Sequence, residues 1–291
     1  MIYGCPNLSC SHYTKRDFVR KDGFYFRKND SRKIKRFRCG HCGKKFSSAT
    51  FSLAVRQKKR RVNEPLFKLL ASGVSMRRAA KILNIHRITV KRKLIYLAAK
   101  ARLAQQELLG KLAKDKVTFM QFDDLITIEH TKLKPLAVTT AVDANRRFIL
   151  GTEVSSIPAF GHLAAMSRKK YGARENAHPE GIKRLFEQIK DAIDDEALIK
   201  SDEHSFYPKV VKKFFPKCRH KRYKGARGSI AGQGELKKLK YDPLFVLNHT
   251  HAMLRANINR LFRKTWCTTK NADMLKNHLD LYIHYFNQNL A

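Results

Sequence analysis

Four cysteines near the start of the chain form two pairs whose spacing suits one tetrahedral metal ion. Cys5 and Cys10 bracket the segment CPNLSC, and Cys39 and Cys42 bracket CGHC. No export signal is visible, so we expect a reducing cytosol, where clustered thiols are typical of metal ligands rather than disulfides. Thiolates bind Zn²⁺ in closed structural sites. The pattern predicts a structural zinc ion held by these four cysteines.

Two alternatives accompany the zinc site. The gap between the first two cysteines is looser than the two-residue gap usual in zinc knuckles, so four unrelated buried thiols would also explain the pattern. His12 and His41 lie close to the pairs in the sequence, and either is able to replace one cysteine as a ligand.

Two acidic residues stand at strands in the larger C-terminal region. Asp123 lies inside the apolar segment VTFMQFDDLITIEH, and Asp202 directly follows ALIKS. A carboxylate projected from a strand in a strongly basic protein is a candidate for cation coordination. Asp123 and Asp202 are therefore candidate metal ligands.

The stretch VLNHTHAMLR contains Asn248, His249 and His251 just before the pattern of a basic amphipathic helix. Three interpretations are open: a metal site, the far end of an active site that begins upstream, or residues that start the helix. A His-x-His pair is typical of zinc or copper sites on strands, but no matching third ligand is visible. Phosphate contact or packing is favoured for the two histidines.

Residues 64–101 have the organisation of a helix-turn-helix. Ser72 and Gly73 end a first helix, Ser75 caps a second, and Asn84 lies in the turn into a third. A plain three-helix bundle with a solvated basic face is the alternative. The third helix is expected to present side chains suited to the major groove of DNA, namely His86, Arg87, Thr89, Lys91 and Arg92.

The remaining periodicities predict the elements that position these residues. Apolar and basic residues alternate between the cysteine pairs, as in the short strands of a zinc ribbon. Residues 117–155 read as an antiparallel meander of about three strands with a turn at residues 143–145. Residues 180–196 read as a helix, and a short buried strand before Asp202 leads into another. Alternating strands and helices indicate an α/β core.

The charge of the chain indicates a polyanionic partner. Lys and Arg number 61 against 24 Asp and Glu, for a formal net charge of +37, far beyond what solubility requires. Nucleic acid is favoured over an anionic membrane because no long apolar run and no lipidation motif is visible. We expect double-stranded DNA as partner, no membrane contact, and a cytoplasmic, nucleoid-associated bacterial protein.

A zinc ribbon, a helix-turn-helix and then acidic residues at strands follow one another along the chain. In this order the chain resembles DDE-type insertion-sequence transposases, most of all the family of insertion sequence one and its relatives. The likeness covers nearly the whole chain and is most specific in FDDLITI, KSDEHSFYP and NHTHAMLRANINRLFRKTW. The resemblance implies a ribonuclease-H-like catalytic core that uses Mg²⁺ or Mn²⁺. It implies that Asp123 and Asp202 are catalytic metal ligands, with Asn248 where the family usually carries Glu.

The resemblance leaves the role of Asn248 open. It is a third metal ligand, a cap for the following helix with the third acid elsewhere, or the mark of a decayed site. The replacement acids nearby in the sequence are Glu203, Glu235 and Asp242. Residues that the resemblance implies as supports of the active site are Asp124, His204, His249 and His251.

The sequence thus predicts a multidomain protein: a zinc ribbon in residues 1–56, an all-α helix-turn-helix domain in 57–110, and an α/β ribonuclease-H-like domain in 111–291. The expected function is DNA transposition, in which the protein binds terminal inverted repeats, cleaves strands and joins them to target DNA. A homodimer or larger assembly is implied by the resemblance. Two alternatives are a DNA-binding regulator with an inactive nuclease core and a zinc-ribbon nuclease.

Overall fold

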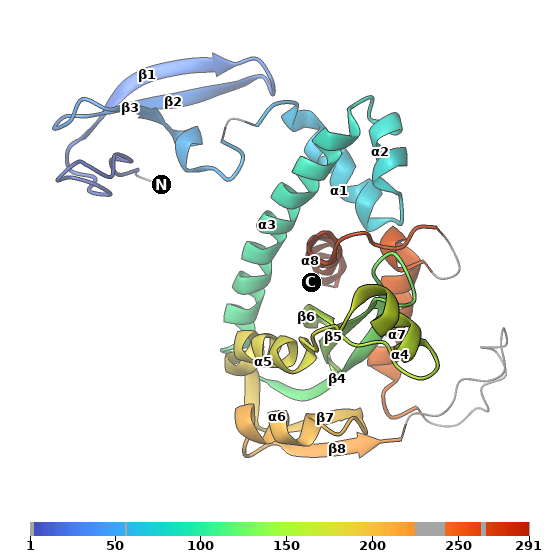
Figure 1. Cartoon of the computed structure of the whole chain (residues 1–291). Helices are drawn as coiled ribbons and strands as arrows, with labels where there is room; N and C mark the ends of the chain where they lie inside the picture. Colours follow the sequence, from blue (N-terminus) through green and yellow to red (C-terminus); the bar gives the residue numbers. More distant parts are fainter. Residues whose placement is uncertain (1–2, 56, 225–241, 263–265, 291) are drawn as a thin grey trace. The chain divides into compact units, whose positions relative to one another are not determined.

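The computed structural model describes residues 3–55, 57–224, 242–262 and 266–290 (Figure 1). The chain divides into two compact units, Met1–Leu66 and Phe67–Ala291. In its described parts the protein is of mixed α/β class, with eight α-helices and two sheets. None of these helices combines the length and apolar content that a bilayer crossing requires.

The first unit is built on a small antiparallel sheet of three strands, β1 (Val19–Arg27), β2 (Arg32–Cys39) and β3 (Lys45–Ser47). The strands expected between the cysteine pairs are confirmed as the β1–β2 hairpin. Aromatic rings pack on one side of it: Phe37 lies 5.7 Å from Phe46 and 5.5 Å from Tyr3, measured between ring centroids. Phe46 is buried among these rings, and Ile34 is buried on the other side of β2.

Three helices follow: α1 (Asn63–Ala71), α2 (Met76–Ile82) and α3 (Arg87–Leu112). Ser75 caps α2 as predicted, because its Oγ accepts a hydrogen bond from the backbone N–H of Arg78 at 3.2 Å. Asn84 has a φ of +48°, a left-handed conformation that Asn tolerates and that turns the chain into α3. Val90 and Leu94 are fully buried and lie on the inner face of α3.

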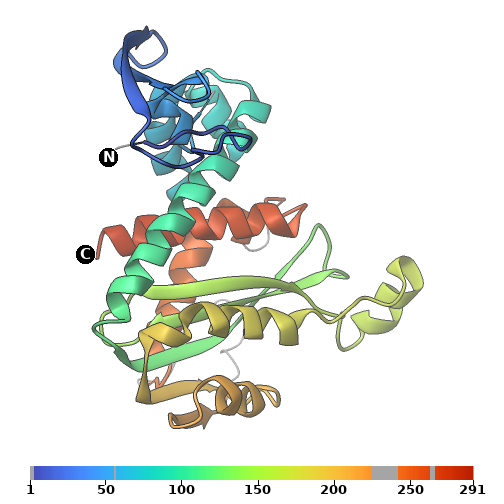
Figure 2. The ribbon, with the colours of Figure 1, turned by 90° about the vertical axis from the view of Figure 1, so that its left-hand side faces the viewer.

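Helix α3 runs 26 residues, well past the predicted end near residue 101. Its second half packs against α8 (Ala272–Gln288), as Figures 1 and 2 both show. Arg102 Nη1 lies 2.7 Å from Asp280 Oδ2 across this contact. Gln105, buried, donates to the backbone carbonyls of Ile149 and Leu150 at the sheet. Tertiary packing therefore extends a helix whose local signals alone suggested an earlier end.

The second sheet has five strands in the order β6-β5-β4-β7-β8. They are β4 (Val117–Ile128), β5 (Pro135–Asp143), β6 (Ile149–Ser156), β7 (Ile193–Asp202) and β8 (Arg219–Tyr223). The first three form the predicted antiparallel meander, whereas β7 is parallel to β4 and β8 is parallel to β7. The sheet is therefore mixed, and its centre is β4.

Helices cover both faces of this sheet. Alternate residues of β5 and β6 belong to different clusters: Ala141 and Leu150 pack with α5 (His178–Ile189) and α6 (Tyr207–Phe214). Their neighbours Val142 and Ile149 pack with α7 (Phe245–Asn257) and α8. Because successive side chains of a strand point to opposite faces, the sheet is the middle layer of three. The short helix α4 (Leu163–Tyr171) lies between β6 and α5 in the sequence.

The helix expected over residues 180–196 is wrong at its end. Helix α5 stops at Ile189, a 3₁₀ turn spans Lys190–Ala192, and β7 already begins at Ile193. The apolar spacing of this segment suits a helix, but Ile193 pairs with Val117 of β4. Ladder hydrogen bonds and burial in the sheet outweigh the local helical preference.

Candidate functional site

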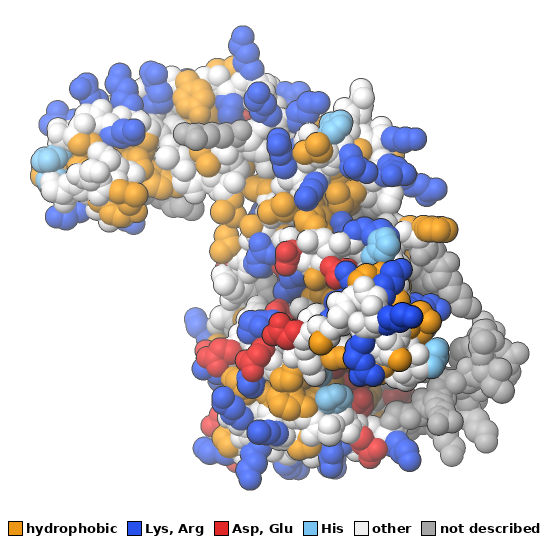
Figure 3. All heavy atoms as spheres, in the orientation of Figure 1, with side chains coloured by type: hydrophobic (Ala, Val, Ile, Leu, Met, Phe, Trp, Pro, Cys, Tyr) orange, Lys and Arg blue, Asp and Glu red, His pale blue; other side chains and the backbone are white. Residues whose placement is uncertain are grey.

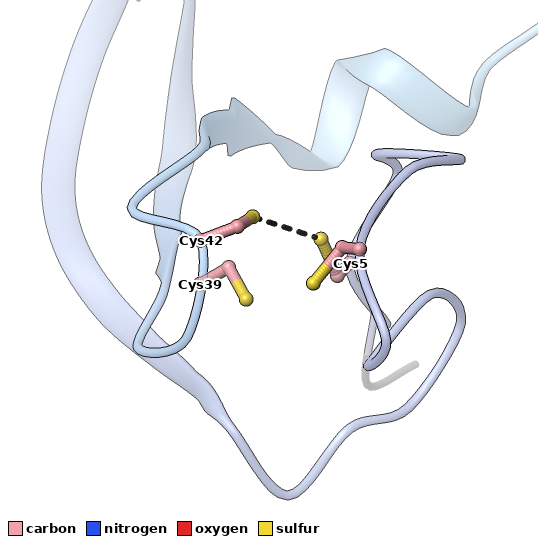
Figure 4. Close-up of side chains that lie close together, drawn as sticks. Cys5, Cys39 and Cys42 are labelled. Atoms are coloured by element: carbon pink, nitrogen blue, oxygen red, sulfur yellow. Dashed lines mark hydrogen bonds between the residues drawn. The ribbon is translucent and has the colours of Figure 1, made fainter.

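The four N-terminal cysteines converge as the spacing predicts. Their sulfur atoms all lie within 4.8 Å of one another, and Cys5 Sγ is 3.7 Å from Cys42 Sγ. Figure 4 shows Cys5, Cys39 and Cys42 pointing toward one another. Cys5, Cys10 and Cys39 are buried, whereas Cys42 is the most exposed of the four. This group can hold a metal ion such as zinc.

Two of these thiols have opposite electrostatic surroundings. Burial raises the pKa of the Cys5 thiol to about 12. A hydrogen bond from the backbone N–H of Lys44 lowers the pKa of the Cys42 thiol to about 6. The thiolate is the form that binds metal, so Cys42 is ready to bind at neutral pH and Cys5 must release a proton.

The alternative involving histidines also has a geometric basis. Cys10, His12 and His41 form a second group whose ligand atoms lie within 4.8 Å of one another, and His41 Nδ1 is 3.7 Å from Cys10 Sγ. Both groups use Cys10, so one ion cannot have both complete sets. The four-cysteine set is the more enclosed, which suits a closed structural site.

A second candidate site lies at the C-terminal end of β7 in the larger unit. A cavity of about 420 Å³ is lined there by three acidic side chains, Asp123, Asp124 and Asp202, together with His178, His204 and Tyr207. Other lining residues are Ile126, Ala137, Ile157, Phe160 and Asn176. The cavity therefore brings together residues from strands and helices that are far apart in the sequence.

Strand register explains why Asp123 and Asp202 meet. The two strands β4 and β7 are adjacent and parallel, and Gln121 pairs with Lys200. Asp123 and Asp202 each lie two residues further along, so they share one level and one face of the sheet. The sequence-based expectation that both carboxylates mark one site has this geometry behind it.

The proximity of the two carboxylates shows in their electrostatics. Burial, reinforced by the negative charge of Asp202, raises the pKa of the Asp123 carboxyl to about 7. A carboxyl with so high a pKa is either protonated or in need of a cation near neutral pH. In the described chain no third His, Cys, Asp or Glu completes a three-ligand cluster with this pair.

Asp124 has a different environment although it is the next residue. Thr139 Oγ1 and the Tyr207 hydroxyl donate hydrogen bonds to its carboxylate at 2.5 and 2.9 Å, and His178 Nε2 lies 2.5 Å from Oδ2. Burial raises the pKa of Asp124, but the contacts with His178, Thr139 and Tyr207 more than reverse this and lower it. The surroundings of Asp124 thus stabilise its charged form, whereas those of Asp123 disfavour its charged form.

His178 was not predicted as a site residue. It lies at the start of α5, which packs so closely on β6 that a Cβ at Gly181 would fall 1.9 Å from Ser155 Oγ. This close approach lets the first turn of α5 reach Asp124. The signal available in the sequence was a His directly before a Pro at a helix start, and nothing in such a signal identifies a carboxylate on a distant strand.

Helix α7 is fixed to β4 close to Asp123. Gln121 Oε1 accepts a hydrogen bond from the backbone N–H of Leu247 at 3.1 Å, and Gln121 Nε2 donates to the carbonyl of Pro243. Gln121 and Asp123 lie on the same face of β4 because they are two residues apart. The first turn of α7, which includes Asn248, therefore begins on the face that carries Asp123.

The structure gives Asn248 a definite partner. Its Nδ2 donates to Asp242 Oδ2 at 2.8 Å, and Asp242 Oδ1 accepts from the backbone N–H of Leu244. Helix α7 is preceded by Leu244 as its N-cap, so the interpretation of Asn248 as a helix cap is wrong. Asn248 is exposed and is not among the residues lining the acidic cavity. Its carbonyl oxygen is the atom suited to a cation.

The remaining acids and histidines are dispersed. Glu203 is exposed next to Asp202, and Glu235 lies outside the described residues. His204 lines the cavity, and its backbone N–H donates to Asp202 Oδ1 at 3.0 Å. His249 is exposed on α7, whereas His251 is buried, and burial lowers its pKa to about 4. His204 alone of these three histidines lines the cavity with the carboxylates.

The predicted DNA-contacting residues lie at the start of α3. Arg87, Lys91 and Arg92 are exposed, and Thr89 is partly buried. His86 is exposed but caps the helix, because its Nδ1 accepts from the backbone N–H of Ile88 at 3.2 Å. The start of α3 therefore presents a basic surface of three cations.

No family model matches the chain, and no curated protein matches it. Functional conclusions therefore rest on the residues and distances described above. The best-defined features are the cysteine cluster and the cavity around Asp123.

We predict that the cysteine cluster binds one zinc ion that stabilises the small unit. Elemental analysis of protein purified without chelators should give about one equivalent of zinc, since structural sites bind the ion tightly. Cys39→Ser should lose most of it, while Cys218→Ser, outside the cluster, should not. Less than about half an equivalent in the parent protein would contradict the assignment.

A second prediction concerns the cost of the Asp123 charge. Its pKa of about 7 exceeds the value near 4 of an unfolded chain. The favourable contribution of the Asp123 carboxyl to folding stability is therefore present below about pH 4, and it is lost as the pH rises through about 7. Asp123→Asn should melt several degrees higher than the parent at about pH 8 without divalent cations, and similarly at about pH 4.

Glu196→Gln is the matched control for this measurement, because Glu196 is an exposed acid outside the cavity. It should melt like the parent at both pH values. Buffers should be depleted of divalent cations before use rather than treated with chelator, so that the cysteine site keeps its ion. An Asp123→Asn variant that is less stable than the parent at the higher pH would show that the charge of Asp123 does not destabilise the fold.

The third prediction concerns His178. His178→Ala removes the imidazole that lies 2.5 Å from the carboxylate of buried Asp124, and should lower the free energy of unfolding by roughly 1–3 kcal/mol at neutral pH. Because the pKa of Asp124 is lowered, its contribution is lost as the pH falls below about 4, and the difference should shrink there. His162→Ala is the control, since His162 is exposed and makes no side-chain cap. Equal urea midpoints for both variants would count against the His178–Asp124 pair.

Proposed function

We propose that the protein is a DNA transposase of the DDE type encoded by an insertion sequence. It binds the terminal inverted repeats of its element, cleaves strands next to them and joins the ends to target DNA. The observation that carries the proposal is the pair Asp123 and Asp202, which face one cavity from adjacent parallel strands. The large unit would then be a ribonuclease-H-like core.

The donor set of the cavity suits Mg²⁺ or Mn²⁺. These ions prefer carboxylate oxygens, and burial, reinforced by the charge of Asp202, raises the pKa of Asp123, as expected for a carboxyl that lacks a cation. When bound, such ions lower the pKa of a nucleophilic water or hydroxyl and stabilise a leaving oxygen. Asp123 and Asp202 would hold them, and the carbonyl of Asn248 would add a neutral ligand.

Other residues of the chain would support this chemistry. Asp124 stays ionised within its hydrogen bonds, so it fixes Tyr207 and His178 at the cavity wall rather than exchanging protons. His204 is exposed beside Asp202 and can contact a phosphate. The buried His251 has a pKa of about 4 and stays neutral, which suits a packing role.

The basic character of the chain supports DNA as the substrate. The net charge is +37, and Figure 3 shows Lys and Arg side chains over the helices α1–α3 and the hairpin β1–β2. In the proposal the exposed cations at the start of α3 read the inverted repeats, and the first unit contacts phosphates. Holding two element ends together calls for a homodimer or a larger assembly, acting at the bacterial nucleoid.

A DNA-binding regulator with an inactive core is the second candidate. The observation that favours it is the exposed Asn248 amide, which binds Asp242 and is a weaker cation ligand than Glu. A zinc-ribbon nuclease would share the cavity but would need no inverted repeats. Cleavage assays separate the three functions.

The test uses labelled duplexes that carry the inverted repeats found in the DNA flanking the gene, with Mg²⁺ or Mn²⁺ added. The parent should cut at the repeat ends and leave scrambled duplexes intact. Asp202→Ala should abolish cutting and leave duplex binding unchanged, because it removes a carboxylate and no DNA-binding cation. Glu196→Gln, at an exposed acid of the same strand outside the cavity, should cut normally.

Variants at Asn248 refine the result. Asn248→Ala should cut more slowly, and Asn248→Glu should retain or raise the rate with Mg²⁺ because a carboxylate binds it better. Binding of repeats without cleavage by any variant or metal would favour the regulator. Equal cleavage of repeat and scrambled duplexes would favour the nuclease.

A further inference from the structure

Two phenylalanine side chains on β1 are exposed to solvent. Phe24 and Phe26 are 49% and 62% exposed. They are two residues apart on one strand, so both rings stand on the same face of the hairpin. A single exposed ring is ordinary, but adjacent exposed rings on a rigid sheet mark a contact surface.

Lysines alternate with these rings across the strands. Phe24 pairs with Lys35 and Phe26 pairs with Lys33, and residues directly opposite each other share a face. Lys33 Nζ lies 4.7 Å from the centre of the Phe24 ring. These four residues, which we call the hairpin face, thus combine two flat aromatic surfaces with two ammonium groups.

The surroundings of the hairpin face differ from it. On the opposite side Tyr25 is 37% exposed and pairs with Ile34, which is buried. Further along the same side as the hairpin face, Phe37 is covered by Tyr3 and Phe46. The acid at the turn, Asp30, is neutralised by Arg27 at 2.6 Å. The hairpin face is the part of the hairpin where two exposed phenylalanine rings lie on the same face as two exposed lysines, and Figure 3 shows hydrophobic side chains among Lys and Arg on this hairpin.

We propose that the hairpin face binds single-stranded nucleic acid, with successive bases stacked on Phe24 and Phe26 and phosphates held by Lys33 and Lys35. Unpaired bases offer π-faces to aromatic rings, and a basic groove follows the backbone. Bases in a duplex are already stacked on one another, so a duplex would gain only the charge contacts. The chain's excess positive charge disfavours a basic protein as the occupant. The inference is independent of the proposed transposase activity.

The experiment measures binding of fluorescent oligothymidine, about 12 nucleotides long, to the full zinc-loaded chain by anisotropy. The double variant Phe24→Leu/Phe26→Leu keeps apolar bulk but loses both π-faces, and should bind about tenfold or more weakly. Phe24→Trp/Phe26→Trp should bind at least as well as the parent. Tyr25→Leu, on the other side of β1, is the matched control and should bind normally.

Two further ligands separate stacking from charge. An abasic oligomer of the same length should bind weakly and equally to the parent and the leucine variant, and a duplex of scrambled sequence should bind equally to both through charge contacts. Equal oligothymidine affinity of the parent and the leucine variant would overturn the proposal. A leucine variant that loses oligothymidine, abasic and duplex binding to the same extent would also overturn it, because the rings would then only support the fold. If the repeats are not cleaved but the binding results are as expected here, only the proposed transposase activity is contradicted.

Discussion

The burial of Asp123 beside Asp202 of the neighbouring strand is the constraint around which the candidate site of the larger unit is arranged. Asp123 and Asp202 lie at one level of parallel strands, and burial, reinforced by the charge of Asp202, raises the pKa of Asp123 to about 7. A protein selected only for stability would have apolar residues at these two positions, or only one acidic residue, because a buried charge without a partner is costly. The fold keeps the pair, which is the usual mark of a site that binds a cation or moves a proton.

The surrounding elements hold this strained pair in position. Asp124 ties α5, α6 and β5 to β4 through His178, Tyr207 and Thr139. On the other face Gln121 fixes the first turn of α7 to the same strand. Both helix layers are thus attached to β4 within four residues of each other, so the cavity wall is rigid where the carboxylates meet. Rigid support of this kind is what a functional constellation requires.

Local chemistry in the sequence was enough to predict the features that depend on near neighbours. The cysteine spacing predicted the sulfur cluster, Ser75 predicted its own cap, and β-branched and aromatic runs around a polar turn predicted β4, β5 and β6. These predictions rest on patterns whose physical cause lies within a few residues. That Asp123 and Asp202 belong to one site was implied by the family resemblance and not by a local pattern.

Features set by distant partners were missed or wrong. The strand at Ile193 exists because β4 supplies its hydrogen bonds, the second half of α3 because α8 covers it, and the role of His178 because α5 packs against β6. Asn248 could not be assigned because its partner Asp242 precedes the helix rather than lying within it. Such cases require the register of the sheet, which periodicity alone does not give.

In the proposed function, Asp123 and Asp202 form a divalent-cation site whose occupation displaces a proton. The direct test is calorimetric titration of the zinc-loaded protein with Mn²⁺ at about pH 6.5 in two buffers of different ionisation enthalpy. Since the pKa of Asp123 is about 7, binding should release a substantial fraction of one proton per ion. Asp123→Asn should remove that release and most of the affinity. Absence of Mn²⁺ binding, or binding with the same proton release in Asp123→Asn, would contradict the claim.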